Sequence, residues 1–565
     1  MNGKPCASTG EARGWESINW AAARTYVKKL QMRIVKAQKE GRIGKVKSLQ
    51  WLLTHSFYAK ALAVKRVTEN SGKKTPGIDN ELWKTPQAKF DATARMKRRG
   101  YRPLPLRRIY IPKKNGKLRP LGIPTMLDRA VQTLHRFSLE PIAETNADPN
   151  SYGFRTGRST HDAIAQCFNA LSRGWSPKWI LEGDIRGCFD HINHEWLIEN
   201  IPMDTEILRK WLKSGFIDTQ KLFPTEEGTP QGGTISPTLM NLTLDGLERY
   251  IHENIPNRYI GYAKQSDKIN FVRYADDFII TGVSQELLRD KVLPLVRAFL
   301  RERGLELSEE KTFITHIDDG FDFLGKNIRM YKGKLLIKPA KTSIKSMLEK
   351  VRTIIKESPS IKQDILIRRL NPIIRGWVNN QRFVVSSEVF SRIDHEIYKC
   401  LWRWAMRRHK KKGRKWIASR YWRQIGTRKW TFSCKTESKK DNGEPYYLRL
   451  EYATDTKIIR YVKIISEANP FDEVWVEYYE EREGERMLHS VKGRKALLAI
   501  WRKQHRCCTV CGENLTAETG FKLHTYKASS GATVKTMVHR ECHKLTHARV
   551  ADSEPVLLTE GFVEA

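Results

Sequence analysis

A pair of adjacent aspartates, Asp276 and Asp277, constrains the fold of this chain more than any other feature. The pair lies inside the run FVRYADDFIIT, and the β-prone residues on both sides predict a hairpin with the carboxylates at its tip. A solvated hairpin tip would suit the letters YADD alone. However, adjacent carboxylates repel each other unless a cation lies between them, and an apolar run upstream, WILEGD, ends in Asp184. If the strands pair, the carboxylates form an oxygen-rich cage suited to two Mg²⁺ ions and to phosphoryl or nucleotidyl transfer.

The net charge indicates the kind of partner. The 565 residues include 101 Lys and Arg and 63 Asp and Glu, which gives a formal charge of +38. A compact protein with this excess repels itself unless it binds a polyanion, so nucleic acid is the expected partner and an anionic membrane surface is the alternative. Because the sequence shows no lipidation signal, no bilayer-length apolar run and no signal-peptide core, we expect no membrane partner and a cytoplasmic location.

Other segments carry turn and helix signals in a fixed order. Residues 111–125 read IPKKNGKLRPLGIPT, where the Asn-Gly pair predicts a hairpin turn that places Lys113 and Arg119 on paired strands. Residues 151–160 read SYGFRTGRST and lead into a helix. Residues 228–241 read GTPQGGTISPTLMN, where adjacent glycines allow close approach of the backbone and the following Ser and Pro predict a helix start.

The pattern of apolar residues changes along the chain. Residues 19–68 predict two helices separated by a glycine-containing break. Strand and helix patterns then alternate over 70–340, which predicts an α+β arrangement, and 341–430 is helical and very basic. Beyond this, the stretches 446–452 and 457–465 are strand-like.

Taken together, these segments resemble a reverse transcriptase and, more closely, the reverse transcriptase and maturase encoded by a bacterial group II intron. The resemblance runs over nearly the whole chain and is weakest in residues 430–490. It implies a multidomain α+β fold with right-hand polymerase fingers and palm, an α-helical thumb, a small DNA-binding region and a zinc-stabilised HNH-like C-terminal domain. The expected domains are 1–70 (N-terminal helical extension), 71–340 (fingers and palm), 341–430 (thumb/maturase), 431–490 (DNA-binding region) and 491–565 (HNH-like).

The resemblance assigns roles to residues of the polymerase site. Asp184, Asp276 and Asp277 are the expected catalytic carboxylates, and the Ile185 carbonyl joins them around two Mg²⁺ ions. Phe189 is expected against the sugar 2′ position, where it excludes ribonucleotides; ordinary core packing is compatible with that role. The residues expected to contact the incoming dNTP are Lys113, Arg119, Phe189 and Gln231. Lys311 is expected close to the site, as a proton donor or a phosphate contact.

The segment LNPIIRGWVNN at 370–380 resembles the maturase-specific thumb. A run over 399–430 follows in which Lys and Arg alternate with tryptophans. Positive charge gives sequence-independent affinity and aromatic rings can stack on unpaired bases, although some tryptophans must form the thumb's own core. We therefore expect this surface to bind group II intron RNA during splicing.

Four C-terminal residues have the spacing of a zinc site. They form two pairs with a two-residue gap, Cys508 with Cys511 and His539 with Cys542. This clustering indicates a metal site rather than the disulfide framework of a secreted protein, and we expect one Zn²⁺ to hold a small domain.

The same region resembles the HNH nuclease domain of intron-encoded proteins, with His524, His543 and His547 as the residues of its metal site. The second histidine of the family's usual pair, its general base, is replaced here by Thr525. We therefore expect the fold and the zinc to be kept, DNA cleavage to be degenerate, and target DNA to be bound.

Other assignments fit less well. A retron or CRISPR-associated reverse transcriptase would not need the basic thumb and the nuclease-like tail. A splicing cofactor with an inactive polymerase would not need the three carboxylates, and Phe189 disfavours a viral RNA-dependent RNA polymerase. The expected setting is a bacterial, nucleoid-associated ribonucleoprotein that retrohomes into DNA.

Overall fold

The computed structural model describes the chain from Gly14 to His543 with short gaps. The residues outside the description are 1–13, 113–115, 117, 219–220, 225–226, 230–231, 257, 261–262, 266, 440–444, 491–494, 513, 517–518, 528–530, 541 and 544–565. The described residues form two compact units, each built from separated segments. The first comprises Met1–Asn146, Leu197–Leu239 and Glu467–Ala565, and the second Ala147–Trp196 and Met240–Ser466.

The first unit begins with helices that pack together. The helices α1, α2 and α3 all contact α5, and apolar side chains such as Leu30, Ile34 and Leu53 are buried among them. Asn19 caps α1, because its side chain accepts a hydrogen bond from the Ala22 N–H at 3.0 Å. The helices wholly within this unit are α1 (Trp20–Lys39), α2 (Ile43–His55), α3 (Phe57–Glu69), α4 (Pro86–Arg95), α5 (Met126–Asn146), α9 (Thr205–Leu212), α17 (Val476–Ser490) and α18 (Lys495–Lys503).

The expectation of two helices over 19–68 is wrong, because the structure has three. The second expected helix is interrupted at Ser56, whose backbone is extended (φ −68°, ψ 133°). No glycine or proline flanks Ser56, so the apolar pattern gives no sign of this break. Separate packing of α2 and α3 against α5 accounts for it.

A four-stranded sheet in the first unit has the order β2-β1-β4-β5. Its expected hairpin is present: β1 pairs antiparallel with β2, and Ile111 lies opposite Arg119. Lys113 lies outside the described residues. The strands are β1 (Leu106–Pro112), β2 (Leu118–Ile123), β4 (Phe216–Asp218) and β5 (Lys221–Phe223).

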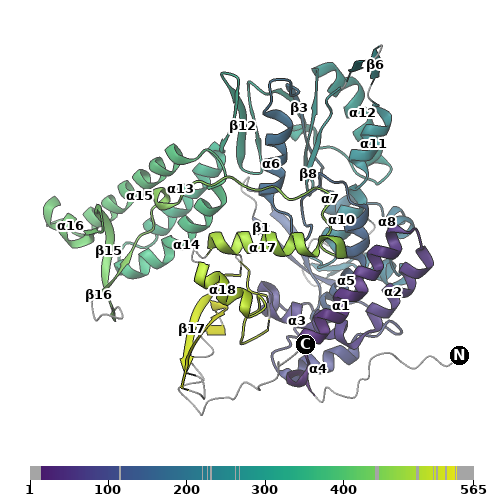
Figure 1. The fold of residues 1–565 in the computed structure, drawn as a ribbon, viewed down its shortest axis with the longest axis horizontal. Coiled ribbons are helices and arrows are strands. Elements are labelled where there is room, and N and C mark those ends of the chain that lie inside the picture. Colours follow the sequence, from purple (N-terminus) through teal and green to yellow (C-terminus); the bar gives the residue numbers. More distant parts are fainter. Residues whose placement is uncertain are drawn as a thin grey trace. The chain divides into compact units, whose positions relative to one another are not determined.

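The second unit contains the sheet that carries the three aspartates, which we call the acidic sheet. Its order is β10-β3-β9-β8, with all neighbours antiparallel, and the helix α6 packs against β8 (Figure 1). Its central strands are apolar and buried, as the sequence pattern predicts. The elements are β3 (Trp179–Asp184), β8 (Phe271–Tyr274), β9 (Asp277–Gly282), β10 (Phe313–His316) and α6 (Thr160–Leu171), with α7 (Cys188–His191), α11 (Leu247–Asn254) and α12 (Leu293–Arg301) in the same unit. The helices α8 (His194–Asn200) and α10 (Ser236–Leu244) cross from one unit to the other.

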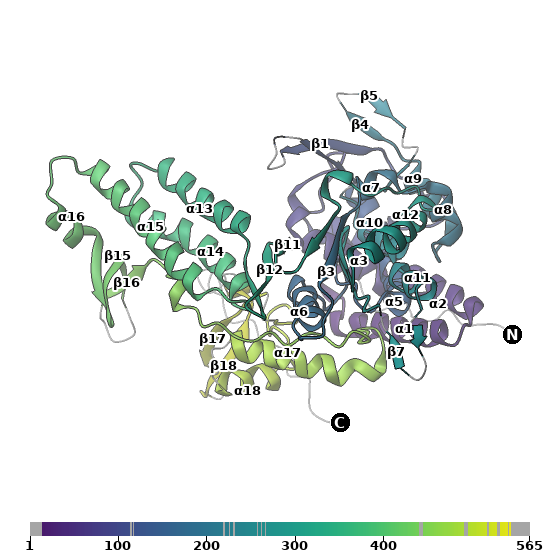
Figure 2. The same cartoon turned by 90° about the horizontal axis from the view of Figure 1, so that it is seen from above.

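The same unit continues into a second sheet and a helical layer. In Figure 2 the helices α13, α14 and α15 lie alongside one another, and their apolar faces share one core with α16 and the strands β14 and β15. The elements are β11 (Phe321–Phe323), β12 (Lys326–Tyr331), β13 (Lys334–Pro339), α13 (Lys341–Lys356), α14 (Gln363–Gln381), α15 (Ser387–Arg408), α16 (Arg414–Tyr421), β14 (Trp422–Ile425), β15 (Arg428–Lys439) and β16 (Pro445–Arg449).

The segment 457–465 is not a strand, contrary to the sequence pattern. The segment is held by a side chain rather than by hydrogen bonds to a neighbouring strand. The carboxylate of Asp162 accepts hydrogen bonds from the Ile464 N–H at 2.8 Å and from the Tyr461 hydroxyl at 3.0 Å. Its alternation of apolar and basic residues therefore reflects an extended segment packed on α6, which sequence periodicity cannot distinguish from a strand.

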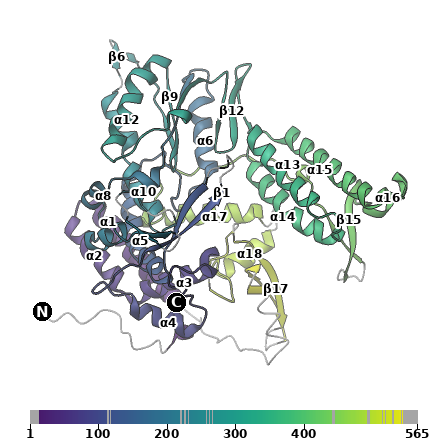
Figure 3. The same cartoon turned by 180° about the vertical axis from the view of Figure 1, so that it is seen from behind.

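The C-terminal part of the first unit, which we call the cysteine module, comprises residues 495–543. It contains α18 and the antiparallel hairpin of β17 (Lys522–Lys527) and β18 (Thr533–Val538), visible from behind in Figure 3. Its buried core, shared with α17, is small and consists of Met487, Trp501, Cys508, Leu515, Met537 and Val538. Among the described residues of the whole chain, no helix is both long and apolar enough to cross a bilayer.

Candidate active site

Strand register brings the acidic residues together. β3 and β9 pair antiparallel so that Asp184 lies directly opposite Asp277. β8 and β9 form the expected hairpin, in which Tyr274 pairs with Asp277 and Asp276 occupies the turn. Ala275 in that turn has φ +60°, a left-handed backbone that side chains other than glycine rarely adopt. The sequence prediction that the two strands lie side by side is confirmed.

The electrostatics of the site favour a bound cation. Burial, followed by the hydrogen bond with Asp184 and the negative charge of Asp276, raises the pKa of Asp277 to about 7. Lys311 opposes this rise, and its ammonium nitrogen lies 2.7 Å from a carboxylate oxygen of Asp184. That hydrogen bond raises the pKa of Lys311, so the lysine carries its positive charge at the site. The prediction that Lys311 lies close to the aspartates is confirmed.

Backbone bonds fix the end of β3. The Asp184 carbonyl accepts a hydrogen bond from the Ser308 N–H at 2.8 Å, and the Ile185 N–H donates to the Asp276 carbonyl at 3.4 Å. Ile185 is buried and forms an isolated antiparallel bridge with Leu307. Its carbonyl as a metal ligand stays a prediction.

Phe189 lies in the short helix that follows Asp184. It is half-buried in α7, and its ring meets the ring of Phe154 edge-on at a centroid distance of 6.4 Å. Gly187 precedes α7 with a left-handed φ of +51°, and an added Cβ there would lie 2.8 Å from the ring of His191. The tight turn thus requires glycine, and it determines where α7, and with it Phe189, lies after Asp184.

Two of the expected dNTP contacts, Lys113 and Gln231, lie outside the described residues. Arg119 is exposed on β2 in the first unit, and its role at a triphosphate stays a prediction.

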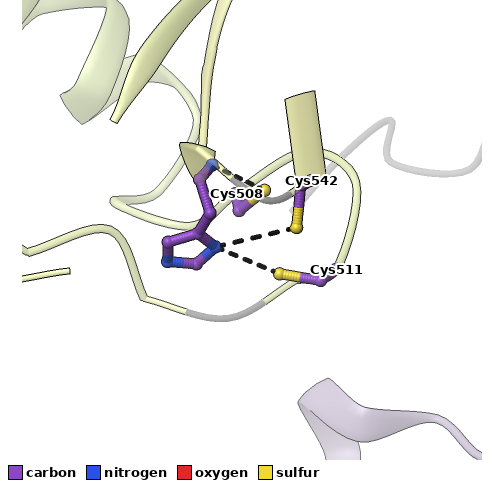
Figure 4. Close-up of side chains that lie close together, drawn as sticks. Cys508, Cys511 and Cys542 are labelled. Carbon is purple, nitrogen blue, oxygen red and sulfur yellow. Dashed lines mark hydrogen bonds between the residues drawn. The ribbon is translucent and has the colours of Figure 1, made fainter. Parts of the chain in front are cut away.

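The four C-terminal ligand candidates converge. One ligand atom from each of Cys508, Cys511, His539 and Cys542 lies within 4.8 Å of all the others. Figure 4 shows the sulfurs of Cys511 and Cys542 directed at one imidazole, 3.3 Å and 4.0 Å from Nδ1 of His539. A hydrogen bond from Cys511, reinforced by backbone N–H groups, lowers the pKa of Cys508 to about 4. Thiolate character at this point suits a soft divalent metal ion.

Two of the three HNH-type histidines also lie together. The rings of His524 on β17 and His543 are edge-on at 5.6 Å. His547 lies outside the described residues. Thr525 pairs with Lys535 across the hairpin, so no second histidine stands beside His524.

Comparison with known proteins identifies the chain at the level of domains. The model for reverse transcriptase (RNA-dependent DNA polymerase) matches residues 111–328, and that for the N-terminal domain of reverse transcriptase matches 15–96. The model for the group II intron maturase-specific domain matches 344–422. Protein YkfC of Escherichia coli K12 is 34% identical over 308 residues, which cover 46% of this chain and 78% of YkfC. The chain belongs to the group II intron-encoded reverse transcriptase and maturase family.

Two further relatives match over a larger share of this chain. The group II intron-encoded protein LtrA of Lactococcus lactis is 30% identical over 57% of this chain and 63% of its own length. Maturase-like protein 1 of Euglena gracilis is 26% identical over 64% of this chain and 76% of its own length. The matched domains make this chain an RNA-directed DNA polymerase with a maturase domain. A solved telomerase from Candida albicans aligns with a TM-score of 0.32 at 14% identity, covering 55% of this chain and 59% of its own, which is too low to bear on the assignment.

The maturase match begins at α13 and ends at the start of β14. Most tryptophans of this segment serve its core: Trp404 and Trp422 are buried, as one alternative in the sequence interpretation held. Trp416 within the segment and Trp430 beyond it remain 39% and 51% exposed, and the Lys412 ammonium lies over the Trp416 ring.

Sequence reasoning missed one residue of the hairpin that carries Asp276 and Asp277: Arg273. Its side chain is fully buried in β8, within a strand whose other residues are apolar or aromatic. The sequence did contain a signal for this residue: a charged side chain stands at a position where the strand pattern calls for an apolar one.

Proposed function

We propose that this chain extends a primer on an RNA template by two-metal nucleotidyl transfer at the acidic sheet. The observation that carries the proposal is the register that puts Asp184 opposite Asp277, with Asp276 in the adjoining turn. The oxygen-only donor set suits Mg²⁺, and the raised pKa of Asp277, which burial and the neighbouring carboxylates cause, supports a cation at this point.

Asp184, Asp276, Asp277 and the Ile185 carbonyl would hold the two Mg²⁺ ions. When bound, such ions make a primer 3′-hydroxyl more acidic and balance the charge of a triphosphate. Lys311, already paired with Asp184, supplies further positive charge and is placed to give a proton to a departing phosphate oxygen. Phe189 would exclude a sugar 2′-hydroxyl, while Lys113, Arg119 and Gln231 would contact the nucleotide.

Primer extension by Asp276→Asn tests this mechanism. We expect a loss of about a thousandfold or more, because losing a metal clamp worth several kcal/mol removes about a factor of ten for each 1.4 kcal/mol. Asp318→Asn, an exposed carboxylate in the same unit, is the matched control and should extend normally. Near wild-type extension by Asp276→Asn would remove the acidic sheet as the catalytic centre.

The thumb surface is the proposed site for intron RNA. Arginine and lysine side chains gather where α15 ends and α16 begins, next to the exposed Trp416; the set is Arg407, Arg408, Lys410, Lys411 and Lys412. Charge on this surface neutralises phosphates, and the ring stacks on an unpaired base. Bound RNA would be held in its folded state during splicing and reverse splicing.

Replacing those five cations with glutamine should weaken intron RNA binding and flatten its salt dependence by about 0.7–0.9 in log–log slope for each lost phosphate contact. Extension of a short primer–template should fall much less. Equal loss of both activities would show that the surface serves the polymerase rather than the maturase.

The cysteine module is proposed to bind one Zn²⁺ and target DNA without cutting it. Cys508, Cys511, His539 and Cys542 form the zinc site, and the His524–His543 pair keeps part of an HNH metal site. With threonine at 525, no side chain there can take a proton from water near neutral pH. DNA insertion then draws its primer from elsewhere, such as a nascent strand, and the ribonucleoprotein works in the cytoplasm at the bacterial nucleoid.

Bottom-strand cleavage of the target DNA, with Mg²⁺ or Mn²⁺, tests this part. We expect no cutting. Robust cutting that disappears in His543→Ala would show an active nuclease with another base.

A further inference from the structure

A buried arginine links the segments that surround the catalytic hairpin. The guanidinium of Arg273 forms an ion pair with Asp245, and both side chains are nearly inaccessible, at 0% and 5% exposed. The same guanidinium donates hydrogen bonds of 3.3 Å to the side-chain oxygen of Asn241 and to the Ala275 carbonyl. Its last contact is the informative one, because Ala275 begins the turn that holds Asp276.

The partners of Arg273 are themselves anchored. Asn241 donates a hydrogen bond to the Gly153 carbonyl at 2.9 Å. A Cβ on Gly153 would lie 2.2 Å from the Ala275 nitrogen, so this glycine allows the two backbones to touch. Backbone bonds close the assembly: the Tyr152 N–H donates to the Arg273 carbonyl at 2.9 Å. Three segments singled out in the sequence therefore meet around Arg273: Asn241 of 228–241 contacts its side chain, and Tyr152 of 151–160 bonds its backbone carbonyl.

We propose that Arg273 is a positioning residue, which fixes the Ala275 peptide in its left-handed conformation and thereby aims the carboxylates of Asp276 and Asp277. The inference rests on the proposed function of the acidic sheet. It explains why a charge is buried in an otherwise apolar strand: an aliphatic side chain would fill the space but could not hold a carbonyl. Asp245 and Asn241 keep the guanidinium in one orientation.

The test must separate aiming from stability, because removing one partner of a buried pair destabilises a protein. The double variant Arg273→Met with Asp245→Leu removes both charges, keeps the volume apolar and lacks the donor to Ala275. The same substitutions in a more exposed ion pair far from the hairpin in sequence, Arg352→Met with Glu396→Leu between α13 and α15, are the control. Circular dichroism and thermal melting check folding in each.

In the folded double variant, we expect Mn²⁺ binding, measured by electron paramagnetic resonance without substrate, to weaken about 10- to 100-fold. We also expect kcat of primer extension to fall about a hundredfold with little change in the KM for dNTP, as a small misplacement of reacting groups would cause. The control pair should change neither quantity. Wild-type Mn²⁺ affinity and kcat in the folded double variant would overturn the proposal.

If the double variant does not fold, Arg273→Lys decides. A lysine has a single nitrogen, which Asp245 holds, so both Mn²⁺ affinity and kcat should fall about tenfold. Wild-type values for both in this variant would contradict the aiming role. Asp276→Asn in the same assays separates the positioning role of Arg273 from the catalytic assignment of the acidic sheet. If Asp276→Asn is inactive while the Arg273 variants are normal, only the positioning role fails. If Asp276→Asn is active, the catalytic assignment fails.

Discussion

The acidic sheet and the cysteine module both gather ligand side chains from separated positions, yet they hold them by different means. Three aspartates of the acidic sheet are fixed by strand register and by backbone bonds around a large apolar core. The cysteine module has a core of a few side chains, one of which, Cys508, is itself a ligand candidate. From this difference we expect the first site to keep its geometry without metal, and the second, if it binds zinc as proposed, to depend on that metal to fold.

The largest effect is expected when the cysteine module loses its proposed metal. Cys511→Ser should release the Zn²⁺ and unfold residues 495–543 locally, because few buried apolar groups compensate. Trp501 is fully buried there, so its fluorescence should shift to the red. Cys400→Ser, a half-buried thiol outside the cluster, is the control. Retained zinc and unchanged fluorescence would show that the module does not depend on its metal.

A second expectation concerns chemistry rather than folding. Deleting residues 495–565 should leave primer extension on a simple RNA template near wild type while weakening binding of target DNA, because the carboxylates lie in the other unit. Gel-shift and extension assays on one preparation compare the two. Loss of extension with DNA binding intact would reverse the assigned roles.

Within the acidic sheet's unit, Phe189→Val should relax sugar selection by about tenfold or more, since several carbons of a packed ring are removed. The ratio of kcat/KM for deoxynucleotides to that for ribonucleotides measures the change. Phe323→Val, a buried ring on β11, controls for general loosening. An unchanged ratio in folded Phe189→Val would limit this ring to packing.

The smallest expected effect is a pH dependence of the scaffold. Burial, opposed by hydrogen bonds from Asn150, raises the pKa of Glu248 from 4.5 to about 7. Between these values the folded protein keeps a proton that the unfolded chain has lost, so this group makes stability fall as pH rises from 4.5 to 7.

Glu248→Gln should abolish this contribution. At pH 5 the variant should be less stable by about 1 kcal/mol, because the glutamine nitrogen cannot accept from the Asn150 N–H. As pH rises towards 8, the wild type should lose this advantage and the variant should not, so the two stability profiles should approach each other and cross. Parallel stability profiles of the two proteins would contradict the role given to Glu248.

Much of both sites follows from the sequence because the signals are local. Alternation around Asp276 predicts the hairpin, and the paired two-residue gaps predict the cysteine and histidine quartet that the structure brings together. What the sequence does not show depends on tertiary packing. The break at Ser56 and the buried network of Arg273 depend on contacts with residues distant in the sequence. The periodicity of apolar residues does not report such contacts.

Hydrogen exchange with and without chelator tests the contrast between the two regions most directly. After metal removal, the amides of β3, β8 and β9 should keep their protection, because register and apolar packing hold them, while those of residues 501–543 should exchange rapidly. Restoring Zn²⁺ should restore protection in the cysteine module alone. Equal loss of protection in both regions, or none in either, would contradict the account of one site as a preformed scaffold and the other as a metal-built fold.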